Sequence, residues 1–137
     1  MRTALDTNVL SALWSNEPIA VRLAAKLGNA RQDGALLVSA PVYAELLAHP
    51  AFPESSINAF LSETGISVDF DILREAWLEA GRRYSKYAAR RRRAAAQESK
   101  RLLADFIVGA HALVQADRFM TLDTGRYKRD FPELKLL

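Results

Sequence analysis

Short apolar runs recur along the chain, and each run is bounded by polar or turn-forming residues. Runs of four or five residues that are apolar almost throughout are typical of strands buried in a parallel sheet, whereas strict alternation indicates a strand with one solvated face. The sequence predicts strands at four such places and a last edge strand at the C-terminus. These segments are Met1–Leu5, Ala35–Ser39, Ile66–Phe70, Phe119–Leu122 and Leu134–Leu137.

Between these runs, apolar residues recur at intervals of three or four positions, which predicts helices. The clearest case is the segment that opens at Pro18 and stops by Gly34, where Ile19, Leu23 and Leu27 stand four residues apart. The other segments expected to be helical are the turn at Asn8–Trp14, a helix from Pro41 to about His49, a helix at Ile57–Glu63 with Ser55 or Ser56 as its N-cap, and a helix from about Asp105 to Gln115.

The longest predicted helix begins at Ile72, with Asp71 as its cap. We expect its apolar stripe to be Leu73, Trp77, Ala80 or Gly81, and Tyr84, which places Tyr84 in the core and leaves Tyr87 open. The stripe fades after Ala88, but the alanine and arginine composition still favours helix through Ala96.

The alternation of strands and helices predicts an α/β fold with a mostly parallel central sheet of four to five strands and helices on both faces. The 137 residues, half of them hydrophobic, show no repeat or linker, so a single domain is expected over residues 1–137. No apolar run approaches the ~20 residues that cross a bilayer, and no signal peptide is evident. We therefore expect a cytoplasmic protein with no membrane partner. The absence of cysteine excludes disulfides, zinc–thiolate sites and thiol nucleophiles.

The net charge of +3 is unevenly distributed. Residues 82–101, the basic stretch, carry +8, so the rest of the chain carries −5. Such a distribution is typical of a protein that binds a polyanion, although a solvated helix face or a surface for an acidic protein remains an alternative. The residues expected to contact nucleic acid are Lys86, Arg90, Arg91, Arg92 and Arg93.

Four carboxylates stand where predicted strands end and the chain turns into a helix. Asp6 follows the first strand, Asp123 follows Phe119–Leu122, Glu45 lies in the helix after the second strand, and Asp105 begins its helix. Ligands of an open parallel sheet bind outside the carboxyl ends of its strands. We therefore expect these four acids, called the acidic rim below, to converge although they come from distant segments.

Clustered carboxylates repel one another unless protons or cations lie between them. Oxygen donors alone select hard cations such as Mg²⁺ or Mn²⁺, and a bound ion of this kind indicates cleavage of phosphate esters by metal-activated water. Whether one or two ions bind stays open. Taken singly, Asp6 and Asp105 are equally consistent with helix caps and Asp123 with a turn, whereas Glu45 has apolar neighbours and most needs a compensating charge.

Residues near the rim acids have predicted supporting roles. Asn8 and Thr121 each stand close to an acid in sequence and are expected to orient it by hydrogen bonding. Gly109 and Ala112, on the same helical face as Asp105, would let the helix approach the sheet. His111 points away from that face, and we expect it to be packed or exposed rather than a ligand. Other acids, among them Asp69 and Asp71, are interpreted as loop or cap residues.

The ordered set of motifs resembles a PIN domain over essentially the whole chain, and most of all the VapC-type toxins of toxin–antitoxin pairs. The motifs are Asp6-Thr7-Asn8, Glu45 in a short helix, Asp105 to Ala112, Thr121-Leu122-Asp123 and a closing Phe131-Pro132-Glu133-Leu134. The resemblance implies a Mg²⁺- or Mn²⁺-dependent endoribonuclease, often a homodimer, that a cognate antitoxin protein inhibits. It assigns both metal binding and catalysis to Asp6, Glu45, Asp105 and Asp123.

Three alternatives remain open at this point. One is a receiver-type phosphoacceptor, which would need an acidic pair beside the first strand, where only Asp6 is found. The second is a catalytically silent nucleic-acid-binding or scaffold module of the same fold, and the third is a PIN nuclease of RNA processing with no toxin role. The sequence does not specify the RNA or its cleavage site.

A homodimer is expected partly from the resemblance and partly from apolar side chains in the short early helices. A small domain has a limited interior, and large exposed apolar patches usually mark interfaces. The residues concerned are Leu10, Leu13, Trp14, Phe52, Ile57, Phe60 and Leu61.

Overall fold

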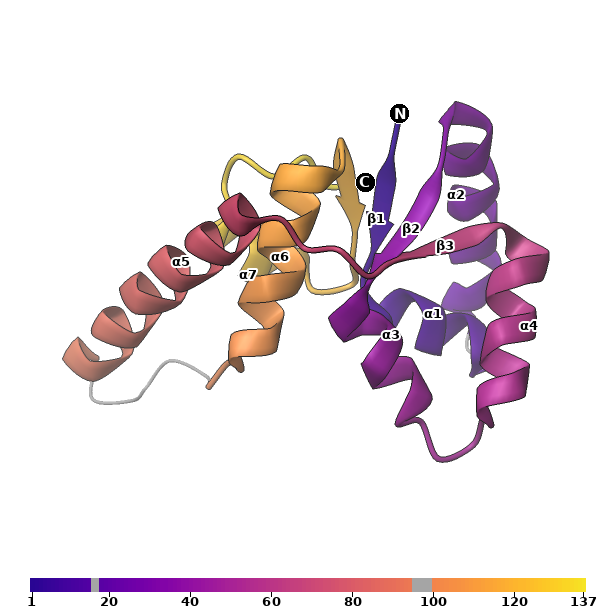
Figure 1. Cartoon of the computed structure of the whole chain (residues 1–137), viewed down its shortest axis with the longest axis horizontal. Coiled ribbons are helices and arrows are strands. Elements are labelled where there is room, and N and C mark those ends of the chain that lie inside the picture. Colours follow the sequence, from indigo (N-terminus) through magenta and orange to yellow (C-terminus); the bar gives the residue numbers. More distant parts are fainter. Residues whose placement is uncertain (16–17, 95–99) are drawn as a thin grey trace.

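The computed structural model describes residues 1–15, 18–94 and 100–137. Within them the fold is α/β, with a parallel sheet of four strands in the order β3-β2-β1-β4 (Figure 1). Every residue of β1, β2 and β4 is buried, as expected for apolar strands that are covered on both faces. The strand bounds are β1 Thr3–Leu5, β2 Leu36–Ser39, β3 Ile66–Asp69 and β4 Arg118–Met120.

The predicted last strand at Leu134–Leu137 does not form as a strand. An isolated parallel bridge joins Phe119 to Leu136, with one hydrogen bond from Phe119 N to Lys135 O (2.8 Å) and one from Leu137 N to Phe119 O (2.9 Å). β4 has only three residues. The pairing therefore stops after a single register position.

Four helices belong to the first half of the chain: α1 Thr7–Trp14, α2 Ile19–Asp33, α3 Ala40–Leu47 and α4 Glu54–Thr64. The prediction that Ser55 or Ser56 caps α4 is wrong. The helix begins at Glu54, and the carbonyl of Pro53 already accepts hydrogen bonds from the backbone N–H groups of Ser56 and Ile57. The serines therefore lie inside the first turn instead of before it.

The second half contributes α5 Arg74–Arg93, α6 Leu103–Gln115 and α7 Thr124–Asp130. α5 and α6 lie side by side at one end of the molecule, with α7 close to them, while α2 and α4 lie on the other side of the strands (Figure 1). Sequence reasoning missed α7, because it has seven mostly polar residues with only Tyr127 and Asp130 buried and so shows no apolar period.

The face of α5 that packs inward differs from the predicted one. Leu73 and Trp77 are each 50% exposed, whereas Ala76, Ala80 and Tyr87 are buried. Ala80 and Tyr84 of the predicted stripe do pack inward, but the bulky Leu73 and Trp77 are left outside, because small alanine side chains let α5 approach α6 closely. Nor does Asp71 cap the helix, since α5 begins at Arg74 with Leu73 at the cap position. The end of the predicted helix, at residues 95 and 96, lies outside the described residues.

The apolar residues expected to form a dimer patch instead pack within the chain. Leu10, Ile57 and Leu61 are buried. The indole of Trp14 packs against the ring of Phe52, with 4.8 Å between the ring centroids, and against the ring of Phe60, with 5.1 Å. Leu13 also packs on the core. The interior is therefore larger than the sequence suggested, because α1, α2 and α4 enclose it together. None of the described helices is long and apolar enough to cross a membrane.

Candidate functional site

Asp6 lies where β1 ends and α1 begins, and both of its carboxylate oxygens accept hydrogen bonds. Oδ1 accepts from the backbone N–H of Thr7 (2.9 Å), which makes Asp6 the N-cap of α1. Oδ2 accepts from the hydroxyl of Thr121 (2.7 Å). The register of β1 with β4 pairs Leu5 with Met120, so one further step places Thr121 directly beside Asp6.

Thr121 and Asn8 join the ends of β1 and β4. The Thr121 hydroxyl donates to Asp6 and accepts from the backbone N–H of Asp123 (3.0 Å). The amide of Asn8 donates to the same hydroxyl (3.4 Å), and its carbonyl oxygen accepts from the backbone N–H of Leu122 (3.1 Å). Thr121 thus orients Asp6 directly, whereas Asn8 contacts no rim acid in the structure and acts through Thr121 and the backbone of Leu122.

The rim acids influence one another electrostatically. Burial raises the pKa of Asp6 above its ordinary value, and the nearby negative charges of Asp105 and Asp123 raise it further, against the two hydrogen bonds that lower it. Burial also raises the pKa of Glu45, which projects from α3, and the charges of Asp6 and Asp105 add to this rise. Asp6 therefore lies within electrostatic reach of Asp105 and Asp123, and Glu45 within reach of Asp6 and Asp105, at the carboxyl edge of the sheet.

Two arginines reach the rim that sequence reasoning did not place there. Asp105, the third residue of α6, accepts a hydrogen bond through Oδ2 from the backbone N–H of Leu102 (3.1 Å), and Arg101 Nε lies 3.9 Å from the same oxygen. Asp123 pairs with Arg126 at 3.2 Å. A signal was present in the sequence, since arginines stand four residues before Asp105 and three residues after Asp123, close enough along the chain to pair with the acid.

The donor chemistry of the rim fits a hard divalent cation. Its acids offer carboxylate oxygens, and two hydroxyl oxygens at the same edge, Thr7 Oγ1 and Ser39 Oγ, are buried with no hydrogen bond within normal geometry to any described residue. Thr7 Oγ1 is nonetheless near enough to Glu45 to offset part of the rise in the pKa of that carboxyl. In the described ranges no three acidic or histidine side chains are already gathered around one point, so the carboxylates would have to converge to hold an ion.

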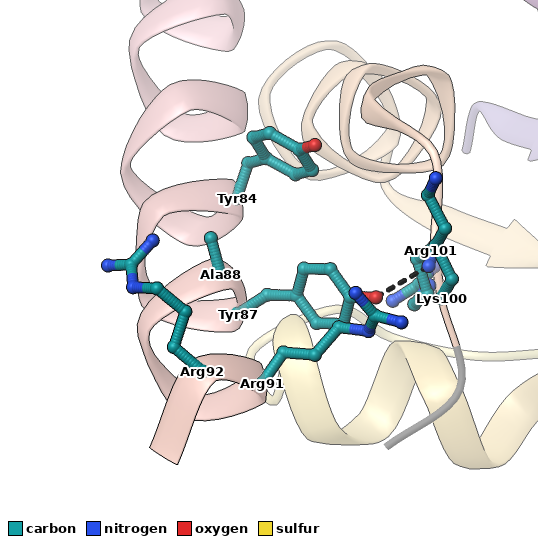
Figure 2. Close-up of a pocket in the computed structure, with 7 residues that line it drawn as sticks. All are labelled: Tyr84, Tyr87, Ala88, Arg91, Arg92, Lys100 and Arg101. Carbon is teal, nitrogen blue, oxygen red and sulfur yellow. Dashed lines mark hydrogen bonds between the residues drawn. The ribbon is translucent and has the colours of Figure 1, made fainter. Parts of the chain in front are cut away.

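The predicted nucleic-acid contacts are divided among different surroundings. Arg90 turns toward α7 and pairs with Asp130 (3.0 Å). Arg92 is exposed and, with Arg91, lines a hollow of about 450 Å³ between the end of α5 and the segment before α6 (Figure 2). Lys86 lines a neighbouring groove, and Arg93 is exposed near the end of α5.

Of the two tyrosines of that hollow, Tyr84 packs against the core as expected, on Phe106 (5.3 Å between ring centroids), and Tyr87, whose role the sequence left open, is the more buried. Tyr87 is 3% exposed, and its hydroxyl accepts a hydrogen bond from the backbone N–H of Arg101 (2.6 Å), whereas Tyr84 is only half-buried. Figure 2 shows both rings projecting from α5 toward Lys100 and Arg101. Tyr87 is therefore a packing residue that joins α5 to the start of α6.

His111 lies away from the rim, as expected, and is almost fully buried. Its Nε2 is 2.9 Å from Asp69 Oδ2, and the side-chain amide of Gln115 donates to the same oxygen (3.1 Å). Asp69 is thus the last residue of β3 and a partner of α6, which corrects its interpretation as a loop or cap residue.

Gly109 serves a different contact from the predicted one. A Cβ at this position would lie 2.5 Å from the ring of Phe131, so the missing side chain admits that ring. Asp105 is therefore positioned by a helix that packs against the C-terminal segment at Gly109.

Comparisons with known proteins agree with this architecture. A family model described as PIN domain matches residues 3–132. VapBC2 from Rickettsia felis bound to a DNA fragment from their promoter is similar over 100% of this chain and 98% of that chain, with a TM-score of 0.75 and 18% identity. VapBC-1 from nontypeable Haemophilus influenzae is similar over 100% of this chain and 97% of that chain, with a TM-score of 0.66 and 23% identity. FitAcB from Neisseria gonorrhoeae is similar over 98% of this chain and 96% of that chain, with a TM-score of 0.66 and 20% identity. No curated protein sequence matches the chain.

Proposed function

The chain belongs to the PIN domain family, whose members are nucleases, and on that premise we propose that it is a Mg²⁺- or Mn²⁺-dependent endoribonuclease. The observation that carries the proposal is the shared electrostatic environment of the acidic rim. Asp105 and Asp123 raise the pKa of Asp6, and Asp6 and Asp105 raise that of Glu45. Burial and neighbouring acids disfavour the charged forms of Asp6 and Glu45, and a divalent cation bound among these two carboxylates, Asp105 and Asp123 would stabilise them.

In the proposed mechanism the acidic rim holds the cation, which when bound supplies an activated water and neutralises charge on the phosphate. The residues of this chain fix the geometry. Thr7 N–H and the Thr121 hydroxyl hold both oxygens of Asp6, and the amide of Asn8 fixes the turn that leads into Asp123. No side chain acts as a nucleophile, so the attacking oxygen comes from water.

Substrate binding is assigned to the basic residues beside the rim. Lys86 and the run Arg90–Arg93 would contact phosphates of the RNA backbone, an attraction that is independent of sequence and sensitive to salt. We assign most of this contact to Arg91 and Arg92, because both line the hollow of Figure 2 beside the start of α6.

The biological role that we propose is that of a toxin in a toxin–antitoxin pair, acting in the cytoplasm. The similar structures are toxin–antitoxin complexes, some of them bound to DNA. We propose by analogy that a cognate antitoxin protein binds this chain and that the toxin is a homodimer. The exposed apolar side chains of Phe70, Leu73 and Trp77 offer surface for such contacts.

The proposal is tested by incubating the protein with single-stranded and structured RNA in Mg²⁺, in Mn²⁺ and in excess chelator. We expect cleavage that requires the metal and is lost in Asp6→Asn but retained in Glu63→Gln, a control at an exposed acid of α4. Binding of RNA without cleavage under all conditions would instead indicate the silent module of the same fold. Cleavage without growth arrest on expression would favour RNA processing over a toxin.

A further inference from the structure

Arg101 is a deeply buried arginine at the edge of the acidic rim. Only 4% of its surface is exposed, and its guanidinium lies over the rings of Phe106 (4.7 Å) and Tyr127 (5.1 Å). Its backbone N–H is held by the Tyr87 hydroxyl, the dashed contact in Figure 2. A guanidinium so far from water destabilises the fold unless its charge and its N–H groups are satisfied.

The pairing of this guanidinium is incomplete. Nη1 forms an ion pair with the Asp130 carboxylate, which is itself buried. Nε is buried as well, but among the residues that the structure describes it has no hydrogen-bond partner. Asp105 Oδ2 is 3.9 Å from Nε, too far for a hydrogen bond, and that oxygen already accepts from Leu102 N–H. One donor of Arg101 is therefore left over on the side of the molecule that carries the rim.

Arg101 also stands between two hollows. One is the hollow of Figure 2, which Arg91 and Arg92 line. The other, of about 350 Å³, is lined by Asp123, the first turn of α7 and the side chains of Arg126 and Arg129. Three arginines around a space that also contains a rim acid provide positive charge where the acids would otherwise repel an anion.

We propose that Arg101 binds a phosphodiester of the substrate, with Nε–H donating to a non-bridging oxygen of a phosphate in the hollow lined by Asp123 and Arg126. The inference depends on the proposed function for the identity of the anion as RNA. Guanidinium is suited to phosphate because its N–H groups form a rigid fork. The ion pair with Asp130 and the two aromatic rings hold that fork in place before substrate arrives, so little ordering is needed on binding.

The competing explanation is that Arg101 only ties α6 to Asp130 and has no ligand. The two explanations differ for Arg101→Lys. Lysine keeps the positive charge near Asp130 but lacks the Nε–H donor and the fork. A purely structural role predicts that any loss of RNA binding follows loss of folded protein, whereas phosphate binding predicts a loss in protein that remains folded.

The experiment uses Asp6→Asn as host, because a variant that does not cleave allows RNA affinity to be measured at equilibrium, and this one leaves Asp105, the acid beside Arg101, unchanged. Arg101→Lys is added to it, and Arg83→Lys serves as the matched control. Arg83 is likewise largely buried and lies over a ring, that of Phe131 (4.8 Å), but its ion-pair partners are Glu79 and Glu133 and not a rim acid. We expect Arg101→Lys to weaken binding of a short RNA about tenfold or more, the size of one hydrogen bond to a charged group, with little change for the control.

A second measurement separates this inference from the proposed function. Inorganic phosphate is titrated into the host protein while the Nε–Hε signal of Arg101, identified by its absence in Arg101→Lys, is followed by NMR. A selective, saturable shift supports the site. If that signal shifts but RNA neither binds nor is cleaved, Arg101 is an anion site and the ribonuclease proposal is overturned. If the wild-type protein cleaves RNA while the signal stays unmoved and both lysine variants bind RNA equally, the inference is overturned and the ribonuclease proposal stands.

Discussion

Stabilisation of the folded protein by a divalent cation should depend on Asp6. An ion that binds the folded state alone, at a concentration of about 100 times its dissociation constant, stabilises that state by ~2.7 kcal/mol. For a domain of this length ~1 kcal/mol corresponds to a shift of about 3–4 °C, so Mg²⁺ or Mn²⁺ should raise the melting temperature of the wild type by roughly 10 °C. Asp6→Asn should lose most of this shift, and Glu63→Gln should keep it.

Without metal, Asp6→Asn removes a buried charge, and this change by itself favours the folded state. Burial and the charges of Asp105 and Asp123 raise the pKa of Asp6, so the ionised carboxylate opposes folding at neutral pH. Asparagine removes that charge, but it has one acceptor oxygen where the carboxylate has two, so either the Thr7 N–H or the Thr121 hydroxyl loses its acceptor, which costs about 1 kcal/mol for one lost hydrogen bond. The two effects oppose each other, so we expect the melting temperature of metal-free Asp6→Asn to lie within a few degrees of the wild-type value at neutral pH.

The pH dependence follows from the sign of the shift. A carboxyl whose pKa is raised by folding stabilises the folded state fully at pH values below its unfolded pKa and loses that contribution as the pH rises through the folded value. The difference in melting temperature between Asp6→Asn and wild type should therefore become less favourable to the variant as the solution is acidified. Differential scanning calorimetry with chelator, Mg²⁺ or Mn²⁺ across this range measures all three effects. An equal metal-induced shift in wild type and variant would refute the assignment of Asp6 as a ligand.

Two further predictions concern binding surfaces. Replacing Arg91 and Arg92 together by glutamate should weaken binding of RNAs of any sequence and flatten the salt dependence of binding, while turnover of bound RNA changes little. Fluorescence anisotropy in a salt series measures the affinity. If the double variant keeps its RNA affinity but loses antitoxin binding, the two residues belong to the surface for the protein partner. Light scattering at low micromolar concentration should give twice the mass of one chain, and a single-chain mass that added Mg²⁺ or RNA leaves unchanged would exclude the homodimer.

The sequence by itself was sufficient to predict the α/β class, the parallel sheet and the positions of its four strands. Buried strands need continuous apolar runs, and the helices between them need apolar residues at helical spacing, so both leave local patterns. The positions of Asp6 and Asp123 after strands were predictable in the same way, because the residue that follows an apolar run in the sequence lies at the carboxyl end of that strand. Elements with little apolar content, such as α7 with its one buried tyrosine, left no such pattern.

Only the tertiary structure decided which faces pack and which charges meet. Ala76 and Ala80 face inward in α5 because close approach to α6 favours small side chains over Trp77, and that choice depends on the partner helix. Arg101 acquired its place beside Asp105 in the same way, since Asp130 and Tyr127, which hold it, come from a helix more than twenty residues later. Local patterns record the burial of a residue's own element, whereas the identity of its neighbours is fixed only when distant segments pack together.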